Sequence, residues 1–336
     1  MKALLQRWLS RLEIWDLLRL LAGHFSHYRH LGLIDLVAKH TLAPRRFSKC
    51  ITWVVNSSNR VRGWVRRHAY MRWRYCYSRL RWRLRREKKG GPRMPSTMTF
   101  SLLCPSRGRV SQAEALIHSV CLTAAQPDRV ELLFYVDSND PCLCAYRYLF
   151  ATTAKRFGKL RRCVLVVGEP MTIGRAWNVL ARTAEGDVLM MANDDQLYVD
   201  YGWDDRAAEA FEQYPDSMVC TFFDQNLGGG RADFPMVPRR WFEVLGYFTP
   251  ELFAFWWHDQ WIIDVATRAG RMHAIKGVCV DHVHFTGYLA AFDETYQRHC
   301  LAPGMWEADQ ALFAQTAEQR ARDALRVREA IAAETM

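Results

Sequence analysis

Gly186-Asp187-Val188-Leu189-Met190-Met191-Ala192-Asn193-Asp194-Asp195 is the stretch that decides the fold, because an apolar run ends abruptly in two adjacent carboxylates. A run of Val, Leu, Met and Ala is typical of a strand covered on both faces, as in a parallel sheet. In open α/β sheets, ligands gather at the carboxyl ends of such strands. The stretch therefore predicts a strand that delivers Asp194 and Asp195 to a binding site.

Two carboxylates on a short turn are suitable ligands for Mg²⁺ or Mn²⁺. These cations prefer oxygen donors, keep several waters and are often completed by substrate phosphates. Taken alone, Asn193-Asp194-Asp195 is more often an ordinary polar turn after a strand. The rest of the chain has to decide between the two interpretations.

Downstream of Thr99, short apolar segments alternate with segments of helical length. The predicted strands are 99–104, 131–136, 163–167, 187–192 and 218–223. The predicted helices between them are 112–124, 141–157, 173–183 and 204–213. A further helix is expected after Trp257, a strand over 277–284 and a surface helix over 307–333. This alternation predicts an α/β fold with a mostly parallel central sheet flanked by helices.

The charge is unevenly distributed over the 336 residues. Residues 1–95 contain 23 Lys and Arg against four Asp and Glu, whereas the remainder contains 23 basic and 31 acidic residues. Gly and Pro between Lys88 and Ser96 indicate a linker. The predicted organisation is a basic, aromatic-rich helical extension over 1–95, an α/β domain over 96–300 and a C-terminal helix over 301–336.

The sequence predicts a cytoplasmic protein without a transmembrane span. Its ten cysteines are scattered without zinc-knuckle or redox spacing, and no apolar run reaches the length of a membrane helix. The first 23 residues carry charges inside the apolar stretch, which is wrong for a signal peptide.

The sequence of the basic extension fits three different binding partners. Arginines interleaved with Trp and Tyr grip nucleic-acid phosphates while stacking on bases, and they also bind anionic membrane surfaces. A basic face that packs on the acidic remainder of the chain is the third interpretation.

Polar residues follow two other predicted strands. The first strand ends near Pro105 and is followed by Arg107 and Arg109, and the second ends at Asp137. Arginine binds phosphate as a bidentate donor, and a carboxylate accepts hydrogen bonds from a base or ribose. Ordinary loops between strand and helix are the alternative. Because Gly-rich dinucleotide and phosphate-loop motifs are missing, the sequence does not indicate a Rossmann dehydrogenase or a P-loop enzyme.

The order of these parts resembles the nucleotide-sugar-dependent glycosyltransferases of the GT-A fold, most closely the family 2-like group. The resemblance covers about residues 99–290. It implies that Asp137 contacts the nucleotide base and that the segment with Gly174, Arg175 and Asn178 lies along the nucleoside. Pro105, Arg107, Arg109 and Asp194 fall on the same donor side.

The resemblance also assigns a metal ligand, since Asp195 matches the second acid of the family's Asp-x-Asp motif. The first acid is Asn193 here, so ligation of Mn²⁺ or Mg²⁺ depends on Asp195 with Asp194 in support. His282 and His284 are two residues apart on a predicted strand, so both side chains are expected on one face. The family often has a histidine after its acidic helix, which favours one of the two as a further ligand.

The segment Trp256-Trp257-His258-Asp259 is similar to the family's acceptor region. Asp259 matches the acid at a helix start that serves as catalytic base, and a helix cap is the alternative. Trp257 and His258 are the predicted acceptor contacts.

The sequence thus predicts an inverting, metal-dependent glycosyltransferase that uses a nucleotide-diphosphate sugar. Its acceptor is either DNA with a hydroxymethyl base or a glycan or glycolipid at a membrane surface. The alternative, suggested by Asn193, is a non-catalytic nucleic-acid- or membrane-binding protein on a degenerate glycosyltransferase body.

Overall fold

The computed structural model describes residues 56–88, 96–158, 160–225, 232–287, 289–300 and 302–335. They fall into two units: His284–Asp293 with the described residues before Val65, and Val65–Val283 with Glu294–Met336. In the smaller unit, 56–64 is helical and Phe285–Gly287 is a short 3-10 helix. Residues 1–55 of the predicted helical extension and most of the predicted linker lie outside the described residues.

The larger unit is built on one sheet with the strand order β3-β2-β1-β4-β7-β6-β8-β5. Its first four strands are parallel. They are β1 (Phe100–Pro105), β2 (Val130–Asp137), β3 (Arg162–Gly168) and β4 (Val188–Met191). The structure confirms each of the four predicted strands to within one residue at either end.

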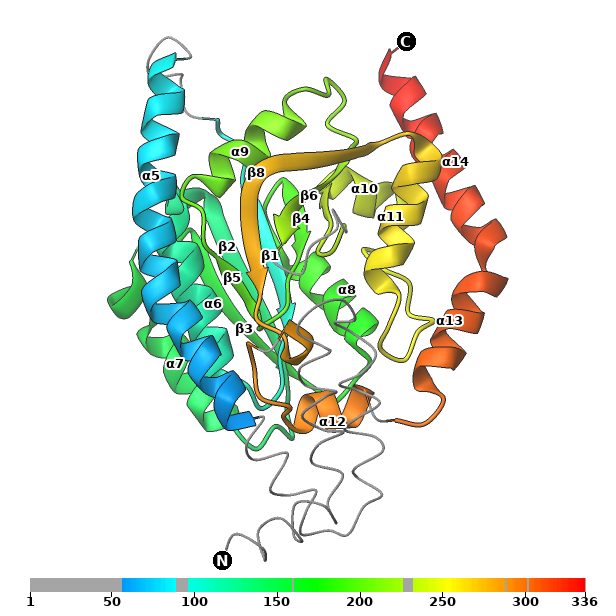
Figure 1. Cartoon of the computed structure of the whole chain (residues 1–336). Coiled ribbons are helices and arrows are strands. Elements are labelled where there is room, and N and C mark those ends of the chain that lie inside the picture. The colour runs from blue at the N-terminus through cyan, green and yellow to red at the C-terminus, as the bar shows by residue number, and fades with distance from the viewer. Residues whose placement is uncertain are drawn as a thin grey trace, which may run out of the picture. The chain divides into compact units, whose positions relative to one another are not determined.

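The other half of the sheet is mixed. Strand β6 (Cys220–Gln225) pairs in parallel with the long strand β8 (Met272–His282). Strand β7 (Met236–Pro238) is antiparallel to β4 and β6, and β5 (Gln196–Tyr198) is antiparallel to β8. Figure 1 shows β8 bending around this half of the sheet. The short strands β5 and β7 were not predicted, because three residues carry too little periodicity.

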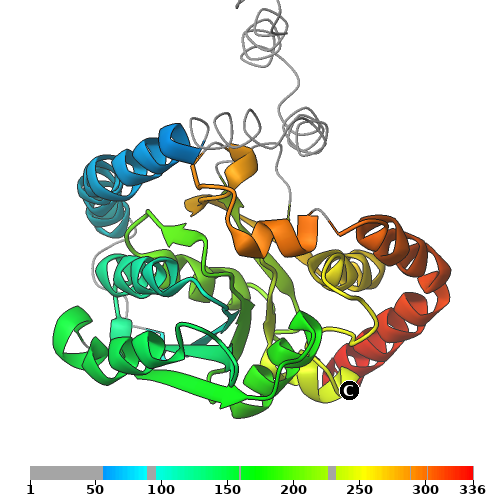
Figure 2. The same ribbon diagram turned by 90° about the horizontal axis from the view of Figure 1, so that it is seen from below.

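Alternating side chains of the central strands build one core on each face of the sheet, as the two-residue period of a strand requires. Phe100, Leu102 and Cys104 of β1 belong to one core, while Leu103 belongs to the other. The first core is completed by α6 (Val110–Thr123), α7 (Leu143–Phe157) and α9 (Trp203–Phe211). The second is completed by α8 (Ile173–Thr183), α10 (Arg239–Leu245), α11 (His258–Ala269) and α14 (Ala317–Thr335). The predicted α/β fold, with a mostly parallel central sheet flanked by helices, is therefore confirmed (Figures 1 and 2).

The C-terminal segment differs from the single predicted helix. It consists of α13 (Met305–Gln315) and α14, which are separated at Thr316. The short helix α12 (Glu294–Cys300) precedes them and was not predicted. Within the larger unit, the chain before the sheet is a π-helical turn, Arg66–Tyr70, followed by α5 (Met71–Lys88). Among the described helices, none combines the length and the apolar character that a membrane span requires.

Candidate active site

The two acids that follow β4 are buried and have different partners. Arg109 Nη1 donates to Asp194 Oδ1 at 3.1 Å, and Ser106 Oγ donates to Asp194 Oδ2 at 2.7 Å. Burial raises the pKa of Asp194 to about 6, with a further rise from the charge of Asp195 and an opposing effect of Arg109. Asp194 is therefore held by the loop that follows β1.

Asp195 faces a histidine and a tyrosine. Its Oδ1 lies 3.3 Å from Nε2 of His282, and its Oδ2 accepts a hydrogen bond of 2.9 Å from the hydroxyl of Tyr296. The pairing of β5 with β8 explains this contact, because it places Gln196 opposite His282. The amide of Val283 donates to the carbonyl oxygen of Asp195 at 2.7 Å and fixes the same register. A carboxylate and an imidazole thus meet where β8 ends.

The other predicted histidine, His284, is the first residue of the smaller unit's second segment. Within that unit its ring lies against Phe285, with the ring centroids 4.5 Å apart. Its role as a metal ligand stays a prediction.

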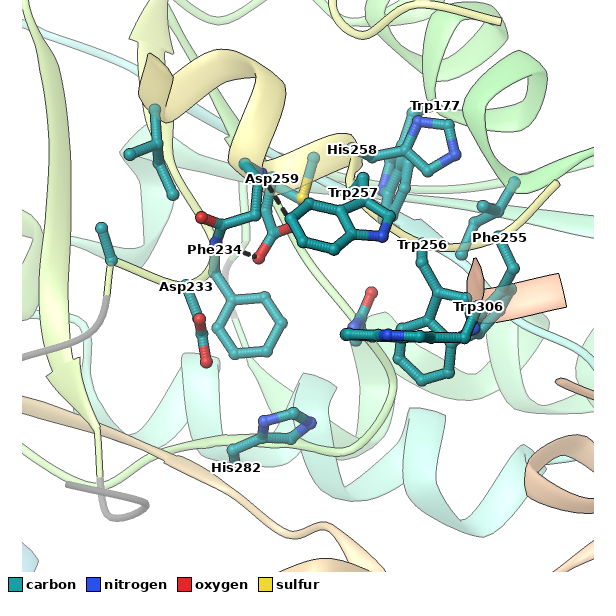
Figure 3. A pocket seen from close by; sticks show the side chains of 16 residues that line it. Trp177, Asp233, Phe234, Phe255, Trp256, Trp257, His258, Asp259, His282 and Trp306 are labelled. Atoms are coloured by element: carbon teal, nitrogen blue, oxygen red, sulfur yellow. Dashed lines mark hydrogen bonds between the residues drawn. The ribbon is translucent and has the colours of Figure 1, made fainter. Parts of the chain in front are cut away.

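A cavity of about 500 Å³ has Asn193 and His282 in its lining. Its lining combines carboxylates, His282 and a large aromatic surface, as Figure 3 shows. Asp259 enters it from the first turn of α11, where the carboxylate oxygen Oδ1 accepts a hydrogen bond of 2.8 Å from the amide of Gln260. The aromatic residues of the lining are Trp177, Phe234, Phe255, Trp256, Trp257 and Trp306.

The aromatic wall is held in place by α13. The carboxylate of Asp309, which is buried, accepts hydrogen bonds of 2.9 Å each from the amides of Ala254, Phe255 and Trp256. Trp306 of the same helix lies edge-on to Trp256, with the ring centroids 5.0 Å apart. The C-terminal helices therefore complete this side of the cavity.

Two aromatic residues of the lining have unusual backbone angles. Phe234 and Trp257 have φ values of 56° and 71°, which bulky residues adopt rarely. Such strain, on the order of 1–3 kcal/mol per residue, collects at functional sites, where the surrounding structure enforces it. Trp257 also stacks on Phe313, with centroids 4.9 Å apart.

His258 differs from its neighbours because its ring is buried in the protein. The side chain is 2% exposed, and its Nδ1 lies 3.0 Å from the hydroxyl oxygen of Thr249. Burial lowers the pKa of His258 to about 4. Although the residue lines the cavity, its predicted contact with an acceptor stays a prediction.

This lowered pKa makes stability depend on pH. The folded chain binds the proton less readily than the unfolded chain, whose pKa is near 6.5, so stability is full above that pH and is lost as pH falls toward 4. We expect His258 to contribute a loss of about 3 kcal/mol across this window. The buried Asp194 opposes it, because a carboxyl whose pKa is raised to about 6 binds its proton more readily in the folded chain and adds stability as pH falls below 6. Urea unfolding at several pH values measures the dependence. His258→Gln should remove this contribution and leave the contributions of Asp194 and of His299, whose pKa burial also lowers to about 4. An unchanged slope in His258→Gln would contradict this account.

The predicted donor residues lie at two places. Arg107 follows Pro105 at the end of β1, and its Nη1 donates to Asp137 Oδ2 at 2.7 Å, which joins the ends of β1 and β2. On α8, the exposed Arg175 pairs with Glu251 at 3.0 Å. Asn178 is buried beneath it.

Asn178 holds the loop after α10. Its Oδ1 accepts hydrogen bonds from the amides of Phe248 and Thr249 at 2.9 and 3.2 Å, and its Nδ2 donates to the carbonyl oxygen of Thr249 at 2.9 Å. The segment that was predicted along the nucleoside therefore has its amide turned toward this loop. A donor contact by Asn178 stays a prediction.

Gly174 allows α8 to approach the same loop closely. A Cβ at this position would lie 2.5 Å from Cε1 of His258 and 2.9 Å from the carbonyl oxygen of Pro250. Because the backbone of Pro250 yields little, we expect Gly174→Ala to lower the free energy of unfolding by about 1–3 kcal/mol. Chemical denaturation measures the loss. Arg182→Ala, an exposed change on α8, is the control and should stay within about 0.5 kcal/mol of the wild type.

Several residues of the site were missed in the sequence. Asp233 and Phe234 follow a glycine-rich segment, 226–231, that lies outside the described residues. Tyr296 and Trp306 come from helices far along the chain. Apart from the presence of aromatic side chains, local patterns carried no signal that Asp233, Phe234 and Trp306 would line the cavity or that Tyr296 would contact Asp195.

Comparisons with known proteins give matches to solved structures alone, since no family model and no curated protein matches the chain. It is similar to S. aureus TarS 1–349 in complex with UDP-GlcNAc, at 13% identity and a TM-score of 0.44, over 55% of this chain and 58% of that chain. It is also similar to the mannosyltransferase PcManGT from Pyrobaculum calidifontis in complex with GDP-Man and Mn²⁺. That match has 14% identity and a TM-score of 0.46, over 84% of this chain and 87% of the other.

A third similar structure is GalNAc-T7 with UDP, GalNAc and Mn²⁺, at 14% identity and a TM-score of 0.46, over 55% of this chain and 44% of that chain. These neighbours are glycosyltransferases of the GT-A type. The chain spans little more than half of the TarS chain in the first match.

Proposed function

We propose that this protein is an inverting glycosyltransferase that moves a sugar from a nucleotide-diphosphate donor to an acceptor hydroxyl. One observation carries the proposal: Asp259 and His282 line the same cavity, and His282 contacts Asp195 directly. A base and a cation-binding pair on one cavity are the two groups that this reaction requires.

The residues beside the cavity fit a divalent cation. A carboxylate oxygen of Asp195 and an imidazole nitrogen of His282 lie 3.3 Å apart, and both atom types are ligands of Mn²⁺. Asp194 is less suited, because its two oxygens already accept hydrogen bonds from Arg109 and Ser106. We propose Asp195 and His282 as ligands, while a role of His284, the other histidine that the resemblance offers, stays a prediction. A bound cation would stabilise the charge of the departing diphosphate.

Asp259 is the proposed base. It lies in the first turn of α11, and the amino end of a helix carries partial positive charge that attracts a carboxylate. The carboxylate would accept the proton of the acceptor hydroxyl while the oxygen forms its bond to the anomeric carbon. The bond from that carbon to the diphosphate breaks on the opposite face of the sugar. Trp257 and His258 are the proposed acceptor contacts.

The donor would lie along the carboxyl ends of β1 and β2. We propose that Asp137 binds the base or ribose there and that Arg107 and Arg109 bind phosphate. Arg109 already pairs with Asp194 at 3.1 Å, so it would share its guanidinium between that carboxylate and a phosphate. The remaining proposed donor residues are Pro105, Gly174, Arg175, Asn178 and Asp194.

Incubation of the purified chain with Mn²⁺ and a panel of nucleotide sugars tests the proposal. We expect hydrolysis or transfer with at least one donor, and its loss when EDTA removes the cation. The absence of both binding and turnover across the panel would contradict the proposal.

The acceptor and the site of action are also proposals. DNA with a hydroxymethyl base and a glycan or glycolipid at a membrane surface both fit a basic extension. We propose a cytoplasmic enzyme that is peripheral to a membrane or associated with nucleic acid. The competing hypothesis of a non-catalytic binding protein is favoured by Asn193 and by Arg109, whose Nη1 lies 3.1 Å from Asp194 and 3.8 Å from Asp195. Donor turnover by the wild type that disappears in Asp259→Asn would exclude it.

A further inference from the structure

The outer face of α5 carries a row of exposed apolar side chains. Trp73, Tyr77, Leu80 and Leu84 are 60%, 45%, 57% and 49% exposed. Their spacing of four, three and four residues places them on one stripe of the helix. Trp73 and Tyr77 stack with a centroid distance of 5.7 Å. These four residues are called the outer stripe below.

The opposite face of α5 is fixed to the larger unit. Met71 and Ser78 are buried, and the guanidinium of Arg74 forms two hydrogen bonds with Asp200, of 2.6 and 2.8 Å. Farther along, the indole nitrogen of Trp82 donates to Asp205 at 3.0 Å. Figure 1 shows α5 running along one side of the sheet unit. Rotation of the helix to bury the outer stripe would break these contacts.

Cations border the outer stripe on both sides. Arg72 and Arg83 lie on one flank and Arg81 on the other, and all three are exposed. Arg81 lies over the ring of Tyr77, with its Cζ 5.6 Å from the centroid. Over its whole length, α5 has seven arginines and one lysine against a single glutamate. Apolar and aromatic groups between cations are the pattern of helices that lie in a membrane interface.

We propose that the outer stripe of α5 docks on an anionic lipid bilayer. Trp73 and Tyr77 would lie at the headgroup level and Leu80 and Leu84 would enter the acyl boundary, while the arginines bind lipid phosphates. Nucleic acid fits less well, because it offers no apolar phase for the two leucines. A second copy of the chain also fits less well, because a helix pair through this stripe would bring arginines of both copies together.

Of the two proposed acceptors, docking on lipid favours the glycan or glycolipid at a membrane surface. Docking on lipid does not depend on the transferase activity, but the inference that the acceptor is a glycan or glycolipid at that surface rests on the proposed function. Failure of the two is distinguishable, since vesicle binding and donor hydrolysis are separate measurements.

Vesicle co-sedimentation of the full chain tests the docking. We expect at least about tenfold tighter binding to phosphatidylcholine vesicles with about one third phosphatidylglycerol than to phosphatidylcholine alone. Leu80→Gln with Leu84→Gln should weaken binding to both, and Arg81→Gln with Arg83→Gln should remove the preference for anionic vesicles. Leu325→Gln, on α14 and 47% exposed, is the matched control and should bind as the wild type. Donor hydrolysis in solution should be unchanged in all of them.

Three results would overturn the proposal. The first is equal binding by the wild type and both double variants. The second is binding of duplex DNA, but not of vesicles, that Arg81→Gln with Arg83→Gln weakens. The third is a dimer in light scattering that Leu80→Gln with Leu84→Gln dissociates.

Discussion

Replacing Asp259 by asparagine is expected to lower the turnover number by about 10²- to 10⁴-fold, the usual contribution of a positioned general base. Asparagine keeps the shape of the side chain and can still accept the hydrogen bond from the amide of Gln260. It cannot accept a proton from the acceptor hydroxyl. The loss should therefore appear in the turnover number, while donor binding stays near that of the wild type.

Steady-state kinetics with the donor identified from the panel measure this effect. Glu212→Gln removes an exposed carboxylate just beyond α9 and should leave turnover unchanged. An unfolding midpoint equal to that of the wild type would show that Asp259→Asn folds normally. Full turnover by a normally folded Asp259→Asn would exclude the residue as the base.

Replacing Asp195 by alanine is expected to weaken Mn²⁺ binding by more than about 100-fold. Partners that only support metal ligands typically contribute 10- to 100-fold, so loss of a ligand should exceed that range. The variant also leaves the hydroxyl of Tyr296 and the imidazole of His282 without the carboxylate that they contact. Transfer should fall together with cation affinity.

Calorimetric titration with Mn²⁺ measures the affinity directly, without a donor. His282→Ala and His284→Ala, compared with each other, rank the two histidines as ligands. His273→Gln, on the same strand but at its opposite end, is the control. Equal Mn²⁺ affinity in Asp195→Ala and the wild type would contradict the proposed cation site.

Most of the central sheet could be predicted, because its strands are short apolar runs with a clear beginning and end. The run from Val188 to Met191 forms β4 as expected, and α8 has the predicted bounds. The predicted strand over 277–284 was too short, since β8 begins at Met272. Its first residues lie at the edge of the sheet and mix exposed with buried positions, so they lack the apolar pattern of a central strand.

The role of the basic extension was less predictable, because charge alone does not show which arginines form ion pairs within the protein. Arg74 and Arg85 pair with Asp200 and Glu209 of the larger unit. This supports, for part of the helix, the interpretation of a basic face packed on an acidic body. The exposed side chains of the outer stripe became visible once that packing fixed the orientation of α5.

The sequence by itself determined the alternation of strands and helices and the delivery of Asp194 and Asp195 to a sheet edge, because both follow from local periodicity. Tertiary structure decided which groups meet those acids. His282 reaches Asp195 through the antiparallel pairing of β5 with β8, two strands more than 70 residues apart, and Trp306 reaches the cavity through the packing of α13. Local patterns cannot specify such contacts, since the contacts depend on how distant segments bury their apolar faces together.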